Sequence, residues 1–404
     1  MKILFLCNKN PYPERDGGCM GMNVYIKEAA RLGNYVKVLA VNSEKNFTDP
    51  DCIPDDYKNA VDYESVMLDM RVKPFRFFTT IFTGKSPHII RFISKDFEKK
   101  IIEILKSEDF DLVMFESIFV CPYLDIVRAN SNAKIVLRAH NIEFKIWERT
   151  SKATKNILKK ILLIHVYRTL RKYELRVINE VDMISSVSSV DAEYLRKHTK
   201  IPVYVLPAGF DMDAVNVPDN VEEEKNTVFH IGAMDWAPNI EGINYLLEKI
   251  WPLIHKENNN IKLHLAGRNM QQSLLCLQKE NVIIDGEVPD AKEYMLSKQI
   301  MIVPLLSGSG MRVKIIEGMM LGKAIVATSI GAEGIECENG KDILIADTPE
   351  NFTECVLKLI EDAEFCMNIE KNAKQTAYSK YNVREIYPKF LKEVEKLSAV
   401  NPVT

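Results

Sequence analysis

The sequence predicts an α/β protein built from two doubly wound parallel-sheet domains. Twelve short apolar runs, rich in β-branched residues, alternate with segments of helical periodicity. Near-continuous apolar strands separated by helices indicate parallel sheets that are buried on both faces. Twelve strands are many for one such sheet, so six in each half is the natural division. A length of 404 residues also fits two domains.

The expected strands form two groups along the chain. In the first half they are 2–7, 35–41, 111–116, 134–139, 182–188 and 203–206, and in the second half 227–231, 261–266, 281–284, 300–305, 324–328 and 343–346. The polar stretch 208–226 between the groups contains Pro218 and has no periodicity, which predicts a linker. The expected domains are therefore 1–208 and 209–382, with residues 209–226 as the linker. Residues 383–404 are expected to form a C-terminal helix and tail, with the helix packing back on the first domain.

The composition excludes several classes of protein. With 47% hydrophobic and 27% charged residues, the chain is globular rather than disordered. No apolar run approaches the roughly 18–20 residues of a membrane span, and the apolar N-terminus is too short for a signal peptide. Eight cysteines form no C-x-x-C pair, and seven histidines form no metal-binding pattern. We therefore expect a cytoplasmic protein with free thiols, no metal and no cofactor.

The charge is distributed unevenly. Residues 1–200 carry 33 Lys+Arg against 26 Asp+Glu, whereas residues 201–404 carry 20 against 30. Segment 152–177 holds eight of the basic residues and one acid, with an apolar stripe at i, i+4 spacing formed by Leu158, Leu162, Val166, Leu170, Tyr173 and Val177. In one interpretation this stripe faces the core and the basic back is solvated. In the other, the helix lies on an anionic membrane or docks a lipid-linked acceptor.

Polar or glycine-rich residues follow two strands of the first half, in the region where doubly wound sheets bind ligands. Gly17 and Gly18 end a long loop and precede a helix, which suits either a structural turn or the approach of an anion to backbone N–H groups. His140 follows strand 134–139 directly. It is a candidate general base or hydrogen-bonding group, although it could equally satisfy a local backbone carbonyl.

The densest segment is 304–328, where a strand ends in a Ser/Gly loop and a helix is expected to begin near Met311. The N–H groups and the dipole of that helix favour phosphate. Arg312 and Lys314 would supply mobile positive charge at the same end. Glu317 lies about one and a half turns into the helix, where a carboxylate can accept two hydrogen bonds from a ribose diol. A helix start with simply exposed Arg and Lys side chains is the alternative.

These segments resemble the family 4 retaining glycosyltransferases of the GT-B fold. The resemblance rests on 302–345, on the G-x-M-D-W-x-P-N pattern within 229–239, and on 265–269 and 331–335. It extends over essentially the whole chain, because the Gly-Gly loop and segment 138–143 fall where the family places theirs. It implies two Rossmann-like domains that face each other across a cleft, the first binding the acceptor and the second a nucleotide-sugar.

The resemblance also implies roles for single residues. The implied catalytic residues are His140, Arg312 and Lys314. The implied donor-binding residues are Gly17, Gly18, Gly232, Asp235, Asn239, Arg268, Asn269, Val288, Ser309, Gly310, Met311 and Glu317. Glu317 matches the second acid of the family's E-x7-E motif, but Ser309 stands where the first acid belongs. Ala233, Met234 and Asp235 also replace the Arg and Lys that many members place after this strand.

The activity implied by the resemblance is metal-independent, retaining transfer of a sugar from a UDP- or GDP-sugar to an acceptor hydroxyl, in polysaccharide, glycan or glycolipid synthesis. The implied partners are the nucleotide-sugar and a glycan or lipid-linked acceptor. Separately from the resemblance, the second interpretation of segment 152–177 adds an anionic membrane surface. Such a protein would be peripheral on the inner face of the membrane. Nucleic acid is not expected, because the basic excess is local. A GT-B-fold nucleotide-sugar-binding protein without turnover, and an epimerase or hydrolase on the same fold, are the alternatives.

Overall fold

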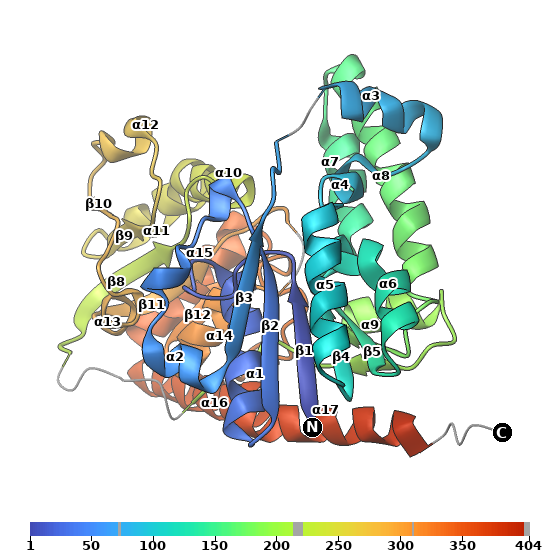
Figure 1. Ribbon diagram of the computed structural model, residues 1–404. Coiled ribbons are helices and arrows are strands. Elements are labelled where there is room, and N and C mark those ends of the chain that lie inside the picture. The colour runs from blue at the N-terminus through green and yellow to red at the C-terminus, as the bar shows by residue number, and fades with distance from the viewer. Residues whose placement is uncertain (72–73, 213–220, 309–310, 400–404) are drawn as a thin grey trace. The chain divides into compact units, whose positions relative to one another are not determined.

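The computed structural model describes residues 1–71, 74–212, 221–308 and 311–399 (Figure 1). The chain divides into two compact units, of which the first comprises Met1–Gly209 and Val383–Thr404 and the second Phe210–Asn382. In the described residues each unit contains one parallel sheet, with seven strands in the first and six in the second. The predicted fold class, two doubly wound parallel sheets, is confirmed.

The first sheet has the order β3-β2-β1-β4-β5-β6-β7, and every neighbouring pair is parallel. Its strands are β1 (Lys2–Cys7), β2 (Tyr35–Asn42), β3 (Asp62–Met67), β4 (Leu112–Glu116), β5 (Lys134–Ala139), β6 (Met183–Ser186) and β7 (Val203–Val205). The α-helices of this unit are α1 (Gly17–Arg31), α2 (Asp55–Ala60), α3 (Pro74–Thr83), α4 (Pro87–Ile90), α5 (Lys95–Ser107), α6 (Leu124–Asn130), α7 (Glu143–Ala153), α8 (Ile157–Val177), α9 (Ser189–Arg196) and α17 (Val383–Ala399). Short 3-10 turns are η1 (Glu44–Asn46), η2 (Pro50–Cys52) and η3 (Ile118–Tyr123).

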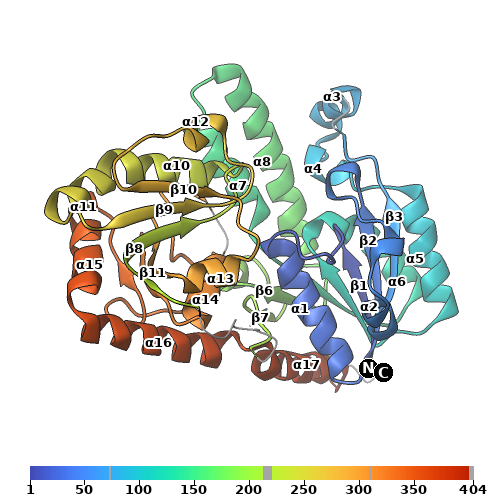
Figure 2. The same ribbon diagram turned by 90° about the vertical axis from the view of Figure 1, so that its left-hand side faces the viewer.

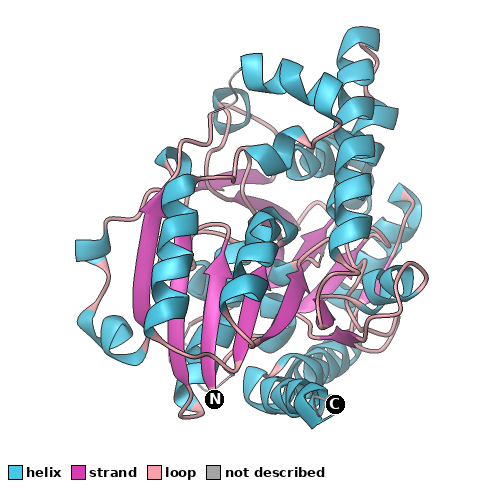
Figure 3. Cartoon of the chain, turned by 45° about the vertical axis from the view of Figure 1, so that its right-hand side comes forward, coloured by secondary structure: helices cyan, strands magenta, loops and turns pink. Residues whose placement is uncertain are grey.

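Alternate residues of the first sheet enter two separate cores, because side chains of a strand point to opposite faces. From β1, Leu4 and Leu6 join the core beneath α5 and α8, whereas Ile3 and Phe5 join the core beneath α1 and α17. Figure 3 shows helices lying across the face of this sheet that is turned to the viewer. Burial on both faces explains why these strands are apolar throughout.

The C-terminal helix α17 packs on the first unit although it follows the second in sequence. Its apolar positions at helical spacing are buried in the same core as α1, and Tyr387 stacks on Phe390. In Figures 1 and 2, α17 runs beside α1. The helix predicted at the C-terminus therefore packs on the first unit, as the resemblance and the periodicity led us to expect.

The second sheet has the order β10-β9-β8-β11-β12-β13, again with every pair parallel. Its strands are β8 (Glu224–Ile231), β9 (Lys262–Ala266), β10 (Val282–Gly286), β11 (Lys298–Val303), β12 (Ala324–Ala327) and β13 (Leu344–Ile345). Its helices are α10 (Ala237–Tyr245), a π-helical turn η4 (Leu246–Ile250), α11 (Trp251–Glu257), α12 (Gln272–Leu275), α13 (Ala291–Leu296), α14 (Val313–Met320), α15 (Pro349–Glu361) and α16 (Ala363–Tyr381). The position of β8 beside β11 places the ends of these two strands together.

Three predictions need correction. The first sheet has a seventh strand, β3, because Asp62 and Glu64 are neutralised by Lys37 of the neighbouring strand, at 2.7 and 2.9 Å. The helix predicted over 152–177 is instead the end of α7, a break, and α8, which begins after the cap residue Asn156. The linker predicted to extend to 226 ends earlier, because β8 begins at Glu224. Residues 213–220 of that linker lie outside the described residues.

Candidate active site

The richest group of candidate residues gathers at the carboxyl ends of β8 and β11. Two backbone hydrogen bonds hold the loop after β8 to the end of β9 and to the loop that follows it, from Gly232 N to Ala266 O at 3.1 Å and from Met234 N to Arg268 O at 2.8 Å. Helix α14 follows β11 and brings its first turn to the same edge, because the carboxyl ends of parallel strands share one edge of the sheet.

Lys314 connects α14 to the end of β8. Its Nζ donates to the carbonyl of Ile231 at 3.1 Å and to Oδ1 of Asn239 at 3.0 Å, and it lies 3.2 Å from Nε2 of His230. Gly232 makes this arrangement possible, because a Cβ there would come within 2.8 Å of both Lys314 Nζ and Asn239 Nδ2. Three of the predicted residues, Gly232, Asn239 and Lys314, are therefore in direct contact.

His230 fixes the direction of the hydrogen bond to Lys314. Its Nδ1 lies 2.9 Å from the carbonyl of Ile302 and must donate to it, so Nε2 is the acceptor for the ammonium. Burial holds the pKa of His230 well below its ordinary value, and the nearby charge of Lys314 lowers it further. Sequence reasoning missed His230, although a histidine inside an apolar strand was visible.

Lys314 has an unusual titration for a lysine. Burial, and after it the charge of Arg312, lower the pKa of its ammonium to about 7, although Glu317 partly opposes both effects. A cation that is partly desolvated and close to a second cation gains free energy when an anion binds next to it. The Lys314 environment therefore favours an anionic ligand.

Arg312 is not the mobile cation that the sequence suggested. It is the cap residue before α14, its side chain is buried, and its guanidinium lies 5.7 Å from the ring centroid of Trp236. Gly308, with φ +117, lets the guanidinium approach, since a Cβ there would lie 3.0 Å from Nη2 of Arg312. The predicted helix start near Met311 is also wrong by two residues, because α14 begins at Val313. The structure therefore fixes this positive charge before a ligand arrives.

The other predicted donor residues are placed as follows. Asp235, Arg268 and Asn269 are exposed in the loops after β8 and β9. Met311 is half-buried before α14, Glu317 is half-buried within it, and Val288 is half-buried beyond the end of β10. Ser309 and Gly310 lie outside the described residues. Trp236 was part of a sequence motif but was not predicted as a site residue, and the structure places its ring beside the guanidinium of Arg312.

In the first unit, His140 follows β5 and points at a buried carboxylate. Its Nε2 lies 2.9 Å from Oε2 of Glu116, the last residue of β4. The pKa of His140 is lowered because burial outweighs the opposing effect of Glu116. Since a hydrogen bond to the carboxylate takes the Nε2 proton, Nδ1 is left as the basic nitrogen. This arrangement suits a histidine that accepts a proton.

Glu116 also lies near a buried arginine. Nε of Arg138 is 3.7 Å from Oε2 of Glu116, and the two side chains are 1% and 0% exposed. The Arg138 guanidinium lies 4.2 Å from the ring centroid of Tyr25, whose hydroxyl donates to the carbonyl of Pro207. Charged residues inside two apolar strands were the signal that could have identified this pair from the sequence.

The Gly17–Gly18 turn begins α1, and its N-terminus already has a carboxylate partner. Asp16 caps the helix by accepting from Cys19 N at 2.9 Å and pairs with Lys9 at 2.6 Å. The pKa of Asp16 is lowered, chiefly because Lys9 outweighs the effect of its burial. A Cβ at Gly18 would lie 2.8 Å from Lys9 Nζ, so the glycine allows the lysine to approach. An anion arriving here would meet Lys9 and compete with Asp16.

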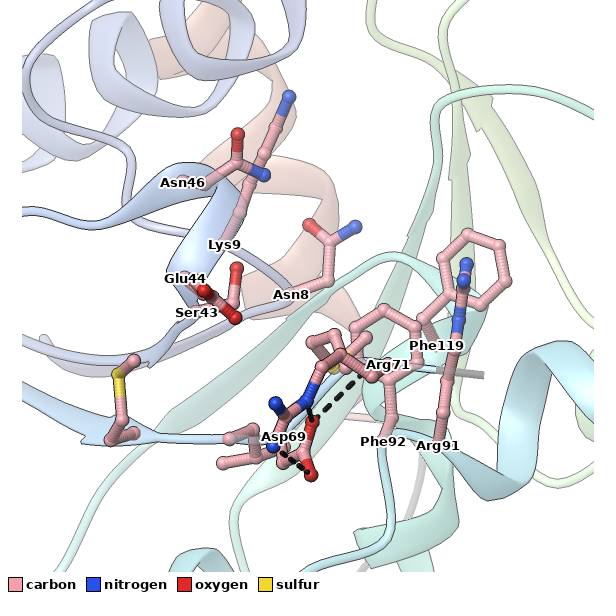
Figure 4. Close-up of a pocket in the computed structure, with 13 residues that line it drawn as sticks. Asn8, Lys9, Ser43, Glu44, Asn46, Asp69, Arg71, Arg91, Phe92 and Phe119 are labelled. Carbon is pink, nitrogen blue, oxygen red and sulfur yellow. Dashed lines mark hydrogen bonds and ion pairs between the residues drawn. The ribbon is translucent and has the colours of Figure 1, made fainter. Parts of the chain in front are cut away.

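A pocket of about 760 Å³ opens at the carboxyl edge of the first sheet (Figure 4). Loops after β1, β2 and β3 line it, together with Phe92 and with Phe119 of η3, whose rings stack with centroids 5.1 Å apart. Asp69 and Arg71 pair within it at 2.8 Å, as the dashed lines in Figure 4 show. Polar groups beside an aromatic pair are typical of a pocket for a small polar molecule. In the described parts of the chain, no group of three or more His, Cys, Asp or Glu side chains could hold a metal.

Comparisons with known proteins agree with this fold. A protein of Klebsiella pneumoniae, described as an uncharacterized 44.6 kDa protein in cps region, is 23% identical, over 97% of this chain and 99% of its own. Among solved structures, Alr3699/HepE of Anabaena in complex with UDP has a TM-score of 0.65 at 14% identity, covering 98% and 100% of the two chains. Sucrose-phosphate synthase from Thermosynechococcus elongatus has a TM-score of 0.69 at 14% identity, covering 99% and 100%.

One family model matches part of the second unit, which carries the Lys314 cluster. Residues 225–362 match the family described as Glycosyl transferases group 1. This match covers about a third of the chain, and over essentially its whole length the chain has a fold of the GT-B type, as these solved structures do.

Proposed function

We propose that the protein is a retaining glycosyltransferase that moves a sugar from a nucleotide-sugar to an acceptor hydroxyl. The observation that carries the proposal is the Lys314 ammonium, held at the end of β8 by Ile231 and Asn239 with a pKa lowered to about 7. A fixed and partly desolvated cation at this edge suits the diphosphate of a donor. The family match over residues 225–362 covers the same edge.

The donor would lie at the carboxyl ends of β8, β9 and β11. Lys314 and Arg312 would neutralise the diphosphate, and Glu317 would accept hydrogen bonds from the ribose. We assign the remaining contacts with the donor to Asp235, Arg268, Asn269, Val288, Ser309, Gly310 and Met311. HepE was crystallised with UDP and with UDP-glucose, which makes a UDP-sugar the first donor to test. We assign neither the nucleotide base nor the sugar of the donor further, and a GDP-sugar is the second donor to test.

The first unit would bind the acceptor. Its pocket of about 760 Å³, with the stacked pair Phe92 and Phe119, offers polar groups and an aromatic surface to a saccharide. Gly17 and Gly18, with Lys9 beside them, would contact the donor from this unit. His140, with Nδ1 as its basic nitrogen, would hydrogen-bond the donor sugar or the acceptor hydroxyl. We propose a glycan or a lipid-linked saccharide as acceptor, in polysaccharide or glycolipid synthesis in the cytoplasm.

The reaction breaks the C1–O bond between the sugar and the diphosphate. Negative charge grows on the leaving oxygen, and Lys314 and Arg312 stabilise it because they are already fixed in place. The acceptor oxygen forms its bond to C1 on the face that the diphosphate leaves, and its proton passes to the leaving phosphate or to His140. Two cations supply the charge that a metal provides elsewhere, so we propose a metal-independent enzyme.

A donor screen tests the proposal. We expect one nucleotide-sugar among UDP-, GDP- and ADP-sugars to raise the melting temperature saturably, by mass action on the folded state. Glu317→Ala should weaken this effect, whereas Glu354→Ala, at an exposed site on α15, should not. With the donor identified, the product should carry the anomeric configuration of the donor sugar, as measured by NMR. Saturable donor binding without any glycoside would instead indicate a binding protein, and interconversion of the donor without acceptor an epimerase or hydrolase.

A further inference from the structure

Six large apolar side chains are exposed at one end of the first unit. They are Ile81 and Phe82 of α3 and Ile157, Leu158, Ile161 and Leu162 of α8, and we refer to them as the α3–α8 tip. Phe82 is 89% exposed and Leu158 is 76% exposed. Single exposed apolar residues are common on protein surfaces, but a group of this size marks an interaction site.

The two parts of the tip are joined. Thr80, beside Ile81, lies 3.1 Å through its Oγ1 from Nε2 of His165, which is one helical turn after Ile161. In Figures 1 and 2, α3 and the turn between α7 and α8 both lie at the upper end of the first unit. The tip is therefore one surface formed by two segments that are far apart in the sequence.

The tip is distinct from the face with which α8 packs on the protein. The core-facing residues are Leu163, Val166, Leu170 and Val177. At about 100° per residue, the four apolar residues of the tip on α8 lie within an arc of about 140°, which faces away from that core. The predicted stripe was therefore partly wrong, since Leu158 and Leu162 are exposed while Val166, Leu170 and Val177 are buried.

Lysines surround the tip. Lys159 and Lys160 lie on opposite sides of the apolar arc on α8, and Lys85, Lys152 and Lys155 are exposed nearby in the sequence. The sequence contains no acid between Glu148, which pairs with Lys152 at 2.8 Å, and the buried Glu174. A second copy of the chain would bring two sets of lysines together, so this charge opposes self-association. Anionic lipid headgroups match it, with acyl chains available to the apolar side chains.

We propose that the α3–α8 tip inserts into an anionic lipid bilayer. Lysines would contact the headgroups while Phe82, Ile157, Leu158 and Ile161 enter the boundary with the acyl chains. Among the described helices, none is long and apolar enough to cross a membrane, so this attachment would be peripheral. The proposal does not depend on the proposed transferase activity, but it would bring the enzyme to a lipid-linked acceptor.

Vesicle sedimentation with the full-length protein tests the insertion. We expect binding to vesicles of phosphatidylcholine and phosphatidylglycerol in equal parts, and little binding to pure phosphatidylcholine. Because apolar side chains also contribute, high salt should reduce the binding without abolishing it. In a Phe82→Trp variant, lipids with brominated acyl chains should quench the fluorescence of the added tryptophan. The same measurement on wild type gives the quenching of the native tryptophans, which is subtracted.

Paired variants separate the two contributions. Phe82→Ser with Leu158→Ser should lower vesicle binding at least tenfold, and so should Lys155→Glu with Lys159→Glu and Lys160→Glu. The control for the apolar variant is Met367→Ser, at an exposed apolar residue on α16. The control for the lysine variant combines Lys99→Glu, Lys106→Glu and Lys371→Glu, at three exposed lysines away from the tip. These controls should bind vesicles as wild type does. All variants should keep the melting temperature and its shift with the nucleotide-sugar, which distinguishes failure of this proposal from failure of the proposed function.

Several results would overturn the insertion. Unchanged vesicle binding by the Phe82/Leu158 variant would show that these side chains do not enter the bilayer. Equal binding to neutral vesicles would exclude recognition of anionic headgroups. A wild-type dimer that the same variant converts to a monomer, with no vesicle binding by either, would assign the tip to a second copy of this chain.

Discussion

Lys314→Met is expected to lower kcat/KM for the nucleotide-sugar by about 10²–10³-fold, the usual effect of removing one fixed group that stabilises developing negative charge. The side chain of methionine fills similar space, so Asn239 and the close approach at Gly232 should persist. Most of the loss should appear in kcat, because the charge on the leaving diphosphate is greatest in the transition state. Steady-state kinetics with the donor found in the screen measures both constants.

The control for this variant is Lys371→Met, which removes an exposed lysine from α16 of the same unit. It should leave the kinetic constants unchanged. Lys314→Arg should be impaired as well, because the larger guanidinium cannot occupy the space beside Gly232 without displacing Asn239. An active Lys314→Met enzyme would show that Lys314 does not stabilise the leaving group.

The same substitution should also change how stability depends on pH. The pKa of Lys314 is about 7 in the folded protein and about 10.4 in the unfolded chain. The unfolded state therefore binds more protons between these two pH values, and the contribution of this group to the free energy of unfolding rises with pH across that window. Below it both states carry the proton, and the contribution stays at its lowest value. Lys314→Met should lack this rise, as chemical denaturation at several pH values would show.

Glu116→Leu is expected to lower the free energy of unfolding by about 3–5 kcal/mol, the usual cost of leaving a buried charge without its partner. Arg138 is 1% exposed and lies 3.7 Å from the Glu116 carboxylate, so it would keep its charge in an apolar setting. Adding Arg138→Met should recover most of the lost free energy, because both charges are then absent. Denaturant unfolding of the two single variants and the double variant measures the coupling.

The matched control is Glu103→Gln on α5, whose carboxylate pairs with Lys100 at 3.2 Å and is 68% exposed. This change should alter the free energy of unfolding by less than about 1 kcal/mol, as is usual for exposed pairs. Glu116→Leu should also release Nε2 of His140, and with it the fixed tautomer. If the variant were as stable as wild type, the Glu116–Arg138 pair would have no role in holding this edge of the sheet.

The strands were predictable where their residues are apolar throughout, because a strand that is buried on both faces of a sheet appears in the sequence as a continuous apolar run. Strand β3 escaped detection because it is an edge strand whose residues Asp62 and Glu64 become acceptable only next to Lys37. The break at Asn156 was equally hidden, since the capping residue lies within a run that continues the helical pattern.

The candidate site was predictable to the extent that spacing along the chain defines it. Gly232, Asn239 and Lys314 were named from motifs, and the structure brings these three into contact. His230, Glu116 and Arg138 were missed because their importance comes from burial and from partners on other strands. The supposed mobility of Arg312 was wrong for the same reason, since only the tertiary structure places it beside Trp236.

The most direct test of a diphosphate site at Lys314 is calorimetric titration of the donor at about pH 8, in two buffers of different ionisation enthalpy. At this pH the free protein has mostly lost the Lys314 proton, and a bound diphosphate should raise the pKa of the ammonium again. We predict that wild type takes up close to one proton when UDP-glucose, or the donor found in the screen, binds, and that Lys314→Met binds more weakly with no such uptake. Absence of binding by any UDP-, GDP- or ADP-sugar, or equal proton uptake by both proteins, would contradict the assignment.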